Sequence, residues 1–205
     1  MANTNINKPF ASSGTRTKWT WSFWFKRSKL GTDLTLSTTY LDSSNEDRLA
    51  FDGQDRLDWY SYQSGSYSNG GRLQTNRKFR DTNSWYHIVI RWDSSNSTAD
   101  DRMKMWINGV EETSFANRSN PTTNRESLFN YGNNSQNWII GSTNDVHYYE
   151  GSISHMHFCD NQLYQALDFG ETDTTTSEWK GKTSPSVNYG TNGFLILKDG
   201  NTITD

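Results

Sequence analysis

Apolar and polar residues alternate along residues 18–26, which read KWTWSFWFK, with Trp24 as the one exception. Successive side chains of a β-strand point to opposite faces of a sheet, so this period of two predicts a strand with two different faces. One face carries four aromatic residues, namely Trp19, Trp21, Phe23 and Phe25. Exposed together, they would form an apolar patch on the order of several hundred Å². We therefore assign these four side chains to the core between two sheets.

The same alternation recurs along the chain and predicts about nine or ten short strands. Asn108-Gly109 favours the type I′ turn of a β-hairpin, and Gly53 lies between two further alternating runs. Residues 161–169 favour one helical turn. We predict an all-β fold, a two-sheet antiparallel β-sandwich of the jelly-roll type. Besides 18–26, the predicted strands cover residues 33–39, 47–51, 55–61, 84–93, the hairpin within 103–115, 137–142, 151–160 and 193–198.

The chain of 205 residues fits a single domain. Its first sixteen residues are polar, small and aperiodic, so we predict an extended N-terminal arm over 1–16 and a sandwich over 17–205. This segment has neither the basic nor the apolar region of a secretory signal, and we expect synthesis in a reducing host cytoplasm. The single cysteine, Cys159, lies in an apolar strand pattern, which predicts a buried and unreactive thiol.

Charge and hydropathy exclude two classes of partner. The net charge is −3, and the 20 basic and 23 acidic residues are interspersed. A nucleic-acid-binding face needs clustered Lys and Arg, so we predict no nucleic-acid partner. No apolar run approaches the ~20 residues of a membrane span, so we predict no membrane partner.

Several motifs follow one another in an order that resembles a known superfamily. They are WTWSFWFKRSKLG, NRKFRDTNSWYHIVIRWD, DRMKMWINGVE, YYEGSISHMHFCDNQL, DFGETDTTTSEWKGK and YGTNGFLI. From about residue 14 to residue 198 the chain resembles the concanavalin A-like (laminin-G-like) lectin/glucanase domain. The form it resembles is the one found in structural and tail-associated proteins of marine bacteriophages and algal viruses. The resemblance implies a jelly roll that is often displayed on a virion.

The resemblance also directs attention to carboxylates, because glucanases of this fold carry E-x-D-x-E or E-x-D-x-x-E on one strand. Glu171 and Asp173 fit the start of this pattern, but the next acid is Glu178, at a spacing of five. An odd spacing puts Glu178 on the opposite face of a strand, and the intervening residues read as a loop. We therefore predict no catalytic residues and a chain that is not an enzyme.

Two kinds of site in the sequence could bind a metal ion, a histidine pair and two acidic loops. His155 and His157 lie on one strand face, with Asp145 and His147 as the nearest further ligands, but surface or inter-sheet histidines are commoner than zinc ligands. Loops 41–47 and 93–101 supply carboxylate and amide oxygens that could hold calcium. Neither loop matches an EF-hand, and both are also ordinary hairpin loops. We predict no metal site and no obligatory cofactor, with calcium as an open alternative.

Glycan binding needs exposed aromatic rings beside planar polar groups. The stretch 57–72 and the loop 129–137 have this composition. Trp24 is the only aromatic residue on the polar face of the strand at 18–26, where it could stack on a sugar or pack under a covering loop. The predicted glycan-binding residues are Trp24, Trp59, Tyr62, Tyr67 and Tyr131. The alternative is that Tyr60 and Tyr62 point into the core.

Together these features predict a non-enzymatic virion structural protein, either a capsid decoration protein or an appendage subunit, that also binds host-surface polysaccharide. Its arm at 1–16 would contact other capsid or tail proteins, and virion symmetry favours a homo-oligomer. Deleting residues 1–14 is then expected to leave the fold intact and to abolish particle attachment. The alternatives are a carbohydrate-binding module of a tail fibre or receptor-binding protein and, less favoured, a glycoside hydrolase.

Overall fold

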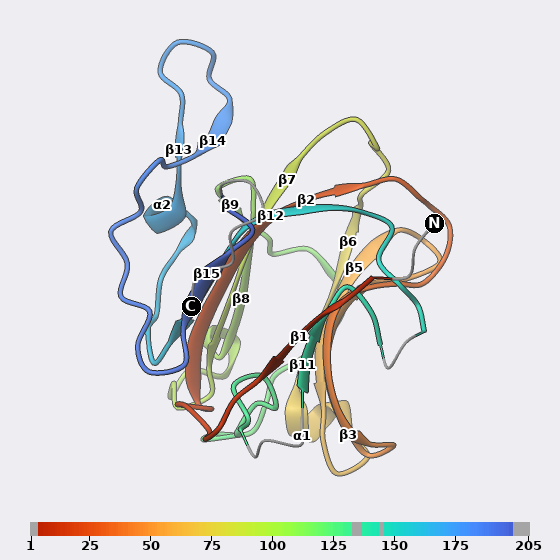
Figure 1. Ribbon diagram of the computed structural model, residues 1–205. Helices are drawn as coiled ribbons and strands as arrows, with labels where there is room; N and C mark the ends of the chain where they lie inside the picture. Colours follow the sequence, from red (N-terminus) through yellow and green to blue (C-terminus); the bar gives the residue numbers. More distant parts are fainter. Residues whose placement is uncertain (1–3, 133–136, 144–145, 199–205) are drawn as a thin grey trace.

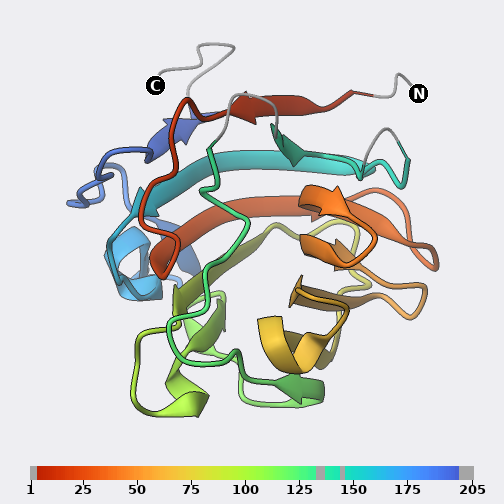
Figure 2. The ribbon, with the colours of Figure 1, turned by 90° about the horizontal axis from the view of Figure 1, so that it is seen from below.

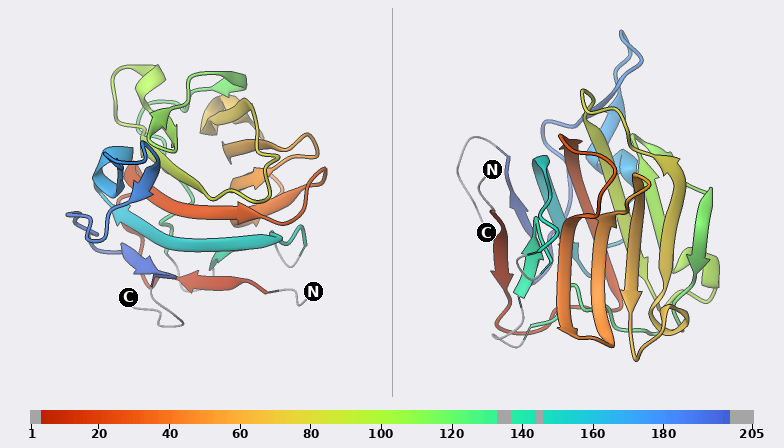
Figure 3. Two further views of the ribbon diagram at one scale, coloured as in Figure 1. Left: turned by 90° about the horizontal axis from the view of Figure 1, so that it is seen from above. Right: turned by 90° about the vertical axis from the view of Figure 1, so that its right-hand side faces the viewer.

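Two antiparallel sheets lie face to face in the computed structural model, which describes residues 4–132, 137–143 and 146–198 (Figures 1 and 2). One sheet has seven strands in the order β1-β11-β3-β4-β5-β6-β10, and the other has six in the order β15-β12-β2-β7-β8-β9. The right-hand view of Figure 3 looks onto the seven-stranded sheet, with β1 and β10 at its two edges. The predicted two-sheet antiparallel sandwich is confirmed.

The strands are β1 (Ile6–Pro9), β2 (Lys18–Arg27), β3 (Leu34–Asp42), β4 (Asn45–Phe51), β5 (Arg56–Tyr62), β6 (Arg72–Lys78), β7 (Tyr86–Asp93), β8 (Met103–Ile107), β9 (Val110–Glu111), β10 (Phe115–Ser119), β11 (Asn137–Ile140), β12 (Gly151–Asp160), β13 (Gly170–Thr172), β14 (Trp179–Gly181) and β15 (Phe194–Ile196). The helical segments are α1 (Tyr67–Gly70), α2 (Ala166–Phe169) and the 3₁₀ turn η1 (Ala99–Asp101). Within the described ranges, no helix has the length and apolar character needed to cross a membrane.

The core between the sheets is built on the aromatic face of β2. Trp19, Trp21, Phe23 and Phe25 are all fully buried, as predicted. Trp19 packs against residues of both sheets, with its ring centroid 6.2 Å from that of Trp92 in β7 and 5.8 Å from that of Trp59 in β5. Each such side chain removes about 150–250 Å² from water, which compensates for the low apolar fraction of the chain.

The hairpin between β8 and β9 turns at the predicted dipeptide. Asn108 and Gly109 have φ values of 47° and 85°, the two positive angles that a type I′ turn requires. The predicted helical turn is α2. Strand β6 was not predicted, because polar Thr75 follows Leu73 on its buried face, while Gln74, also buried, faces outward beside Asp58, so the segment lacks an apolar alternation.

Residues 4–16 do not form a free arm. Ile6–Pro9 pairs with Asn137–Ile140 as an edge strand of the seven-stranded sheet. Phe10 is only 5 % exposed and lies 6.2 Å, centroid to centroid, from Trp138. Deleting residues 1–14 would therefore remove a strand and a core side chain, so the expectation that the deletion leaves the fold intact is corrected.

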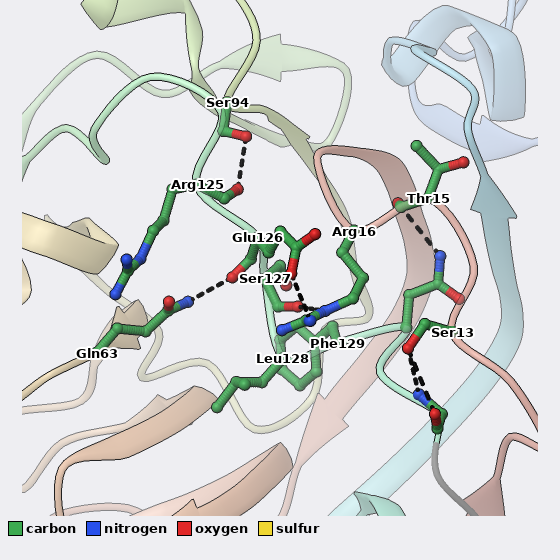
Figure 4. Close-up of polar contacts among 12 residues, drawn as sticks. Ser13, Thr15, Arg16, Gln63, Ser94, Arg125, Glu126, Ser127, Leu128 and Phe129 are labelled. Carbon is green, nitrogen blue, oxygen red and sulfur yellow. Dashed lines mark hydrogen bonds and ion pairs between the residues drawn. The ribbon is translucent and has the colours of Figure 1, made fainter.

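Residues 125–132 close one end of the sandwich and hold the N-terminal segment in place (Figure 4). The guanidinium of Arg16 donates from Nε to the carbonyl oxygen of Ser127 at 2.7 Å and from Nη1 to Glu126 Oε2 at 2.6 Å. On the other side, Gln63 Nε2 donates to the carbonyl oxygen of Glu126 at 2.7 Å. This crossing segment thus links residues near the start of the chain to the seven-stranded sheet.

The chain after β12 covers part of the outer face of the six-stranded sheet. A second apolar cluster forms there from Val89, Trp106, Cys159, Ala166 and Phe169. Cys159 is fully buried, and burial raises the pKa of its thiol to about 12, as expected for an unreactive thiol. The hairpin of β13 and β14 continues from this covering segment and projects beyond the end of the sandwich (Figure 1).

Candidate functional site: a tryptophan-lined pocket

Three tryptophans line one open pocket on the outer face of the six-stranded sheet. Its volume is about 570 Å³, within the range of about 300–1,000 Å³ usual for small-molecule sites. Trp24 comes from β2, Trp85 from the residue before β7 and Trp179 from β14. The other lining residues are Ser154, His155, Lys180, Gly181, Lys182, Thr183 and Lys198.

Trp24 is held by a stack of rings. Strand pairing places it opposite His87 of β7, and the two ring centroids lie 4.9 Å apart with planes inclined by 27°. The ring of His87 in turn stacks on Trp179 at 5.8 Å. Trp24 itself remains half-buried, so part of its surface is left to the pocket.

Hydrogen bonds determine the protonation state of His87, which is 1 % exposed. The indole N–H of Trp179 can only donate, and it lies 3.0 Å from His87 Nδ1, which must therefore accept. The ring proton is then on Nε2, which lies 2.8 Å from Ser22 Oγ. Burial, with a smaller effect from His157, lowers the pKa of His87 to about 3, so the ring is neutral at physiological pH.

The β13–β14 hairpin carries Trp179 to the pocket, and glycines let the indole lie close to the backbone. A Cβ on Gly109 would come within 2.5 Å of the Trp179 ring, and one on Gly170 within 2.3 Å. Neither position can accept a side chain without moving Trp179. The turn at Asn108-Gly109 therefore shapes both the β8–β9 hairpin and one wall of the pocket.

We expect Gly109→Ala to destabilise the fold by about 2 kcal/mol, because it adds left-handed strain and a clash with Trp179. Urea unfolding measures the loss, and near-ultraviolet circular dichroism reports the moved indole. Gly31→Ala is the matched control, because Gly31 has a similar φ of 72° but nothing within 4 Å of its added Cβ. Equal losses and unchanged aromatic spectra in both variants would contradict the packing role of Gly109.

A β-bulge shapes the polar rim of the pocket. The pairing of β12 with β2 shifts between Ser154 and His157, and His155 has a φ of 48°. Bulges commonly re-aim side chains next to binding sites. Here the bulge leaves His155 exposed at the rim, whereas His157 is buried, with Nδ1 2.9 Å from the hydroxyl of Tyr189.

Trp59 was predicted to bind glycan, and this prediction is wrong. The residue is 1 % exposed and packs in the core, with its ring centroid 5.8 Å from Trp19 and 6.3 Å from Trp92. The pairing of β4 with β5 sets Trp59 opposite the buried Leu49 and so turns its ring inward. The alternative with both tyrosines in the core is wrong for Tyr62, which is half-buried. Tyr60 is 8 % exposed, but it lies outside the central core cluster, on the opposite face of β5 from Trp59.

Tyr62 and Tyr67 come together on the outer face of the other, seven-stranded sheet. Their ring centroids lie 4.8 Å apart, and Tyr60 lies 5.3 Å from Tyr67. The guanidinium of Arg72 stacks over the Tyr67 ring at 4.8 Å and also binds both carboxylate oxygens of Asp58. The face of Tyr67 is thus already occupied by a protein group.

Tyr131 belongs to neither cluster. It lies near the end of the crossing segment, and Arg16 stacks over its ring at 4.6 Å. Residues 133–136 of the loop that includes Tyr131 lie outside the described residues. The predicted glycan-binding residues therefore divide among two outer faces, the core and the closed end of the sandwich.

The carboxylates that partly match the glucanase pattern, Glu171, Asp173 and Glu178, lie on the projecting hairpin. Asp173 accepts a 2.8 Å bond from Lys180 Nζ and bonds from the N–H groups of Thr175 and Thr176. These bonds, led by that from Lys180, lower the pKa of Asp173, whereas a catalytic acid needs a raised pKa. Glu171 lies 3.6 Å from the same ammonium.

Several of the residues named as possible metal ligands have other partners where the structure describes them. Asp145, one of the considered zinc ligands, lies outside the described residues. In the candidate calcium loops, Asp42 accepts from the N–H of Ser44, and Asp93 accepts from the hydroxyl of Ser95. Among the described residues, no three His, Cys, Asp or Glu side chains gather as metal ligands would.

Two tryptophans of the pocket were missed from the sequence, although one carried a signal. In the strand at 84–93 the core positions are Ile88, Ile90 and Trp92, so Trp85 has the opposite parity and must face outward like Trp24. Trp179 gave no such signal, because its place depends on how the covering segment folds back over the sheet.

The comparisons with known proteins agree with this architecture. The sequence model of the concanavalin A-like lectin/glucanases superfamily matches residues 2–166. The chain belongs to this superfamily. The recognition made from its motifs is thus confirmed at the level of the superfamily. No curated protein matches the sequence.

Solved structures share the fold at low sequence identity. A heptameric SAP-like pentraxin from Limulus polyphemus superposes with a TM-score of 0.52 at 10 % identity, over 95 % of each chain. The CBM40 of the Ruminococcus gnavus IT-sialidase, bound to α2,6-sialyllactose, gives 0.54 at 11 % identity, over 80 % of this chain and 95 % of its own. Domain 4 of the Geobacillus stearothermophilus arabinanase AbnA, with arabinotriose, gives 0.50 at 19 % identity, over 78 % and 68 %. These likenesses concern the fold.

Proposed function

We propose that this chain is a carbohydrate-binding protein and that the tryptophan-lined pocket holds its sugar. The observation that carries the proposal is the convergence of Trp24, Trp85 and Trp179, from three separate elements, on one open pocket. Trp85 is 41 % exposed and belongs to neither apolar cluster, so its ring is accessible from the pocket that it lines. Superfamily membership and the glycan-bound neighbours support the same class of ligand.

The pocket has the mixed chemistry that a sugar needs. The C–H face of a pyranose is apolar and packs against indole rings, while its hydroxyls seek hydrogen-bonding groups. Ser154, His155 and Thr183 supply such groups at the rim. The stack of Trp24 on His87 and Trp179 holds the platform rigid, so little conformational entropy is lost when a sugar binds.

Trp85→Ala is expected to weaken glycan binding about two- to tenfold, because one aromatic stacking contact is worth about 0.5–1.5 kcal/mol. Trp85 is exposed, so this variant should fold normally, which thermal unfolding verifies. A glycan array identifies the ligand, and isothermal titration calorimetry then measures the affinities. Trp24→Ala should lose binding as well.

Tyr62→Ala is the matched control on the other sheet and should bind like the parent protein. If Tyr62→Ala loses binding while Trp85→Ala keeps it, the sugar site is the tyrosine cluster beside Arg72 and the pocket assignment is wrong. If the parent protein binds no glycan on a broad array, carbohydrate binding itself is refuted.

The proposal extends to where the protein acts. We infer a non-enzymatic structural protein displayed on a phage particle as a capsid decoration or appendage subunit, in contact with other virion proteins and as a homo-oligomer. The motif resemblance to viral structural proteins supports this inference, and the hairpin carboxylates bound to Lys180 support a role without hydrolysis. Labelled antibody on purified particles tests the location, and incubation with host polysaccharide tests for hydrolysis.

A further inference from the structure

We propose that the tryptophan-lined pocket selects anionic glycans, whose carboxylate or sulfate groups bind the lysines at its rim. This inference rests on the proposed function and specifies its ligand class. Among the described residues, the ionic side chains that line the pocket are Lys180, Lys182 and Lys198, beside His155, and no carboxylate lines it within residues 4–132, 137–143 and 146–198. Such a collection is unexpected on a chain with a net charge of −3.

The three lysines differ in how far protein groups already offset their charge. Lys180 is held by Asp173 at 2.8 Å and by Glu171 at 3.6 Å, so its charge is largely compensated. Lys182 Nζ donates to the carbonyl oxygen of Leu167 at 2.6 Å, a neutral partner that leaves its positive charge in place. Lys198 is exposed and lines the pocket close to the end of β15.

The arrangement places charge and stacking within reach of one sugar residue. Lys182 lies next to Gly181, whose backbone approaches Trp24 so closely that an added Cβ would lie 3.3 Å from the indole nitrogen. A ring stacked on the tryptophans therefore lies in the same pocket that the Lys182 side chain lines. Charge-assisted hydrogen bonds are roughly twice as strong as neutral ones, so an acidic substituent there should bind tighter than a hydroxyl.

The test compares matched acidic and neutral ligands. Oligogalacturonate and its methyl ester differ only in the carboxylate charge, and dextran sulfate and dextran differ only in the sulfates. Calorimetry on the full chain should show at least tenfold tighter binding of one or both acidic forms, with an affinity that falls as NaCl rises from 20 to 300 mM. Lys182→Gln with Lys198→Gln should reduce this preference about tenfold, whereas Lys78→Gln, at an exposed lysine that ends β6 on the other sheet, should leave it unchanged.

The outcomes either identify the acidic group of the ligand that the pocket binds or contradict the proposal. A preference for oligogalacturonate alone identifies a carboxylate ligand, a preference for dextran sulfate alone identifies a sulfate ligand, and both identify charge as the criterion. If the array instead yields only neutral glycans whose binding Trp85→Ala removes, the anionic inference is overturned while the proposed function stands. If no glycan binds at all, both fail.

Discussion

Asp55→Asn should destabilise the fold by about 3–5 kcal/mol, the cost expected when a buried ion pair loses one partner. Asp55 and Arg27 are 3 % and 1 % exposed. Arg27 Nη2 donates to Asp55 Oδ1 at 3.0 Å, and Arg27 Nη1 donates to the carbonyl oxygen of Phe79 at 2.8 Å. Because Arg27 ends β2 and Asp55 lies between β4 and β5, the pair connects the two sheets.

The amide of asparagine isolates the effect of charge at this position. Asp55 has a φ of 65°, and asparagine tolerates that region almost as well as aspartate. Burial alone would raise the pKa of Asp55, but hydrogen bonds from the Gly31 N–H, Arg80 and Arg27 outweigh it and lower the pKa. The native state therefore favours the charged form, which Asp55→Asn removes, and Arg27 stays buried beside a neutral group.

Urea unfolding at pH 7 measures the change, with Glu150→Gln as the control. Glu150 forms a 2.6 Å ion pair with Lys29, but that lysine side chain is 51 % exposed, and surface pairs contribute about 0–1 kcal/mol. A loss for Asp55→Asn no larger than that for Glu150→Gln would refute the role of the buried pair in joining the sheets.

The strand pattern alone was sufficient to predict the core face of β2, because four aromatics of one parity leave a single way to bury them. It was insufficient for β5, where Trp59 and the tyrosines alternate and either parity presents aromatic rings to the core. The choice there depends on the opposite sheet, since Trp59 fits against Trp19 and Trp92. A local pattern does not contain that information.

Long-range contacts also explain the other differences between the predicted and the observed structure. Ile6–Pro9 is short and polar, and becomes a strand only because Asn137–Ile140, far away in sequence, offers an open edge. The pocket likewise combines residues of β2, β12 and β14 whose proximity depends on long-range pairing and on one bulge. Trp24 could be identified as its centre, because a lone outward tryptophan is visible in the alternation, but its partners could not.

Acid should destabilise the protein well above the pH at which most carboxylates titrate, mainly through His87. In the unfolded chain a histidine has a pKa of about 6.5, whereas in the fold burial lowers the pKa of His87 to about 3. Between these values the unfolded state binds a proton that the native state excludes, so stability falls as pH falls from 6.5 toward 3. At pH 4.5 the contribution of His87 to this loss is about 2–3 kcal/mol.

Two other buried groups also change how the stability of the fold depends on pH. Burial lowers the pKa of His157 to about 4, which adds to the loss at acid pH. Asp47 is buried too, and burial raises its pKa, so protonation of Asp47 acts in the opposite direction and makes the total change smaller than the sum for the histidines. The contribution of His87 must therefore be isolated by a variant rather than read from the parent protein.

His87→Asn keeps an acceptor near the position of Nδ1 for the indole of Trp179 but has no group that titrates in this range. The variant should be less stable at pH 7, because it loses the stack between Trp24 and Trp179, yet its loss between pH 7 and pH 4.5 should be about 2–3 kcal/mol smaller than that of the parent. Urea unfolding at both pH values measures this difference.

The control is His147→Asn, at an exposed histidine, which should show the same pH dependence of stability as the parent protein. If His87→Asn also keeps the pH dependence of the parent, His87 accepts a proton without unfolding. Because a proton on Nδ1 would break the bond from Trp179, the same titration should also loosen the pocket wall and weaken sugar binding at low pH.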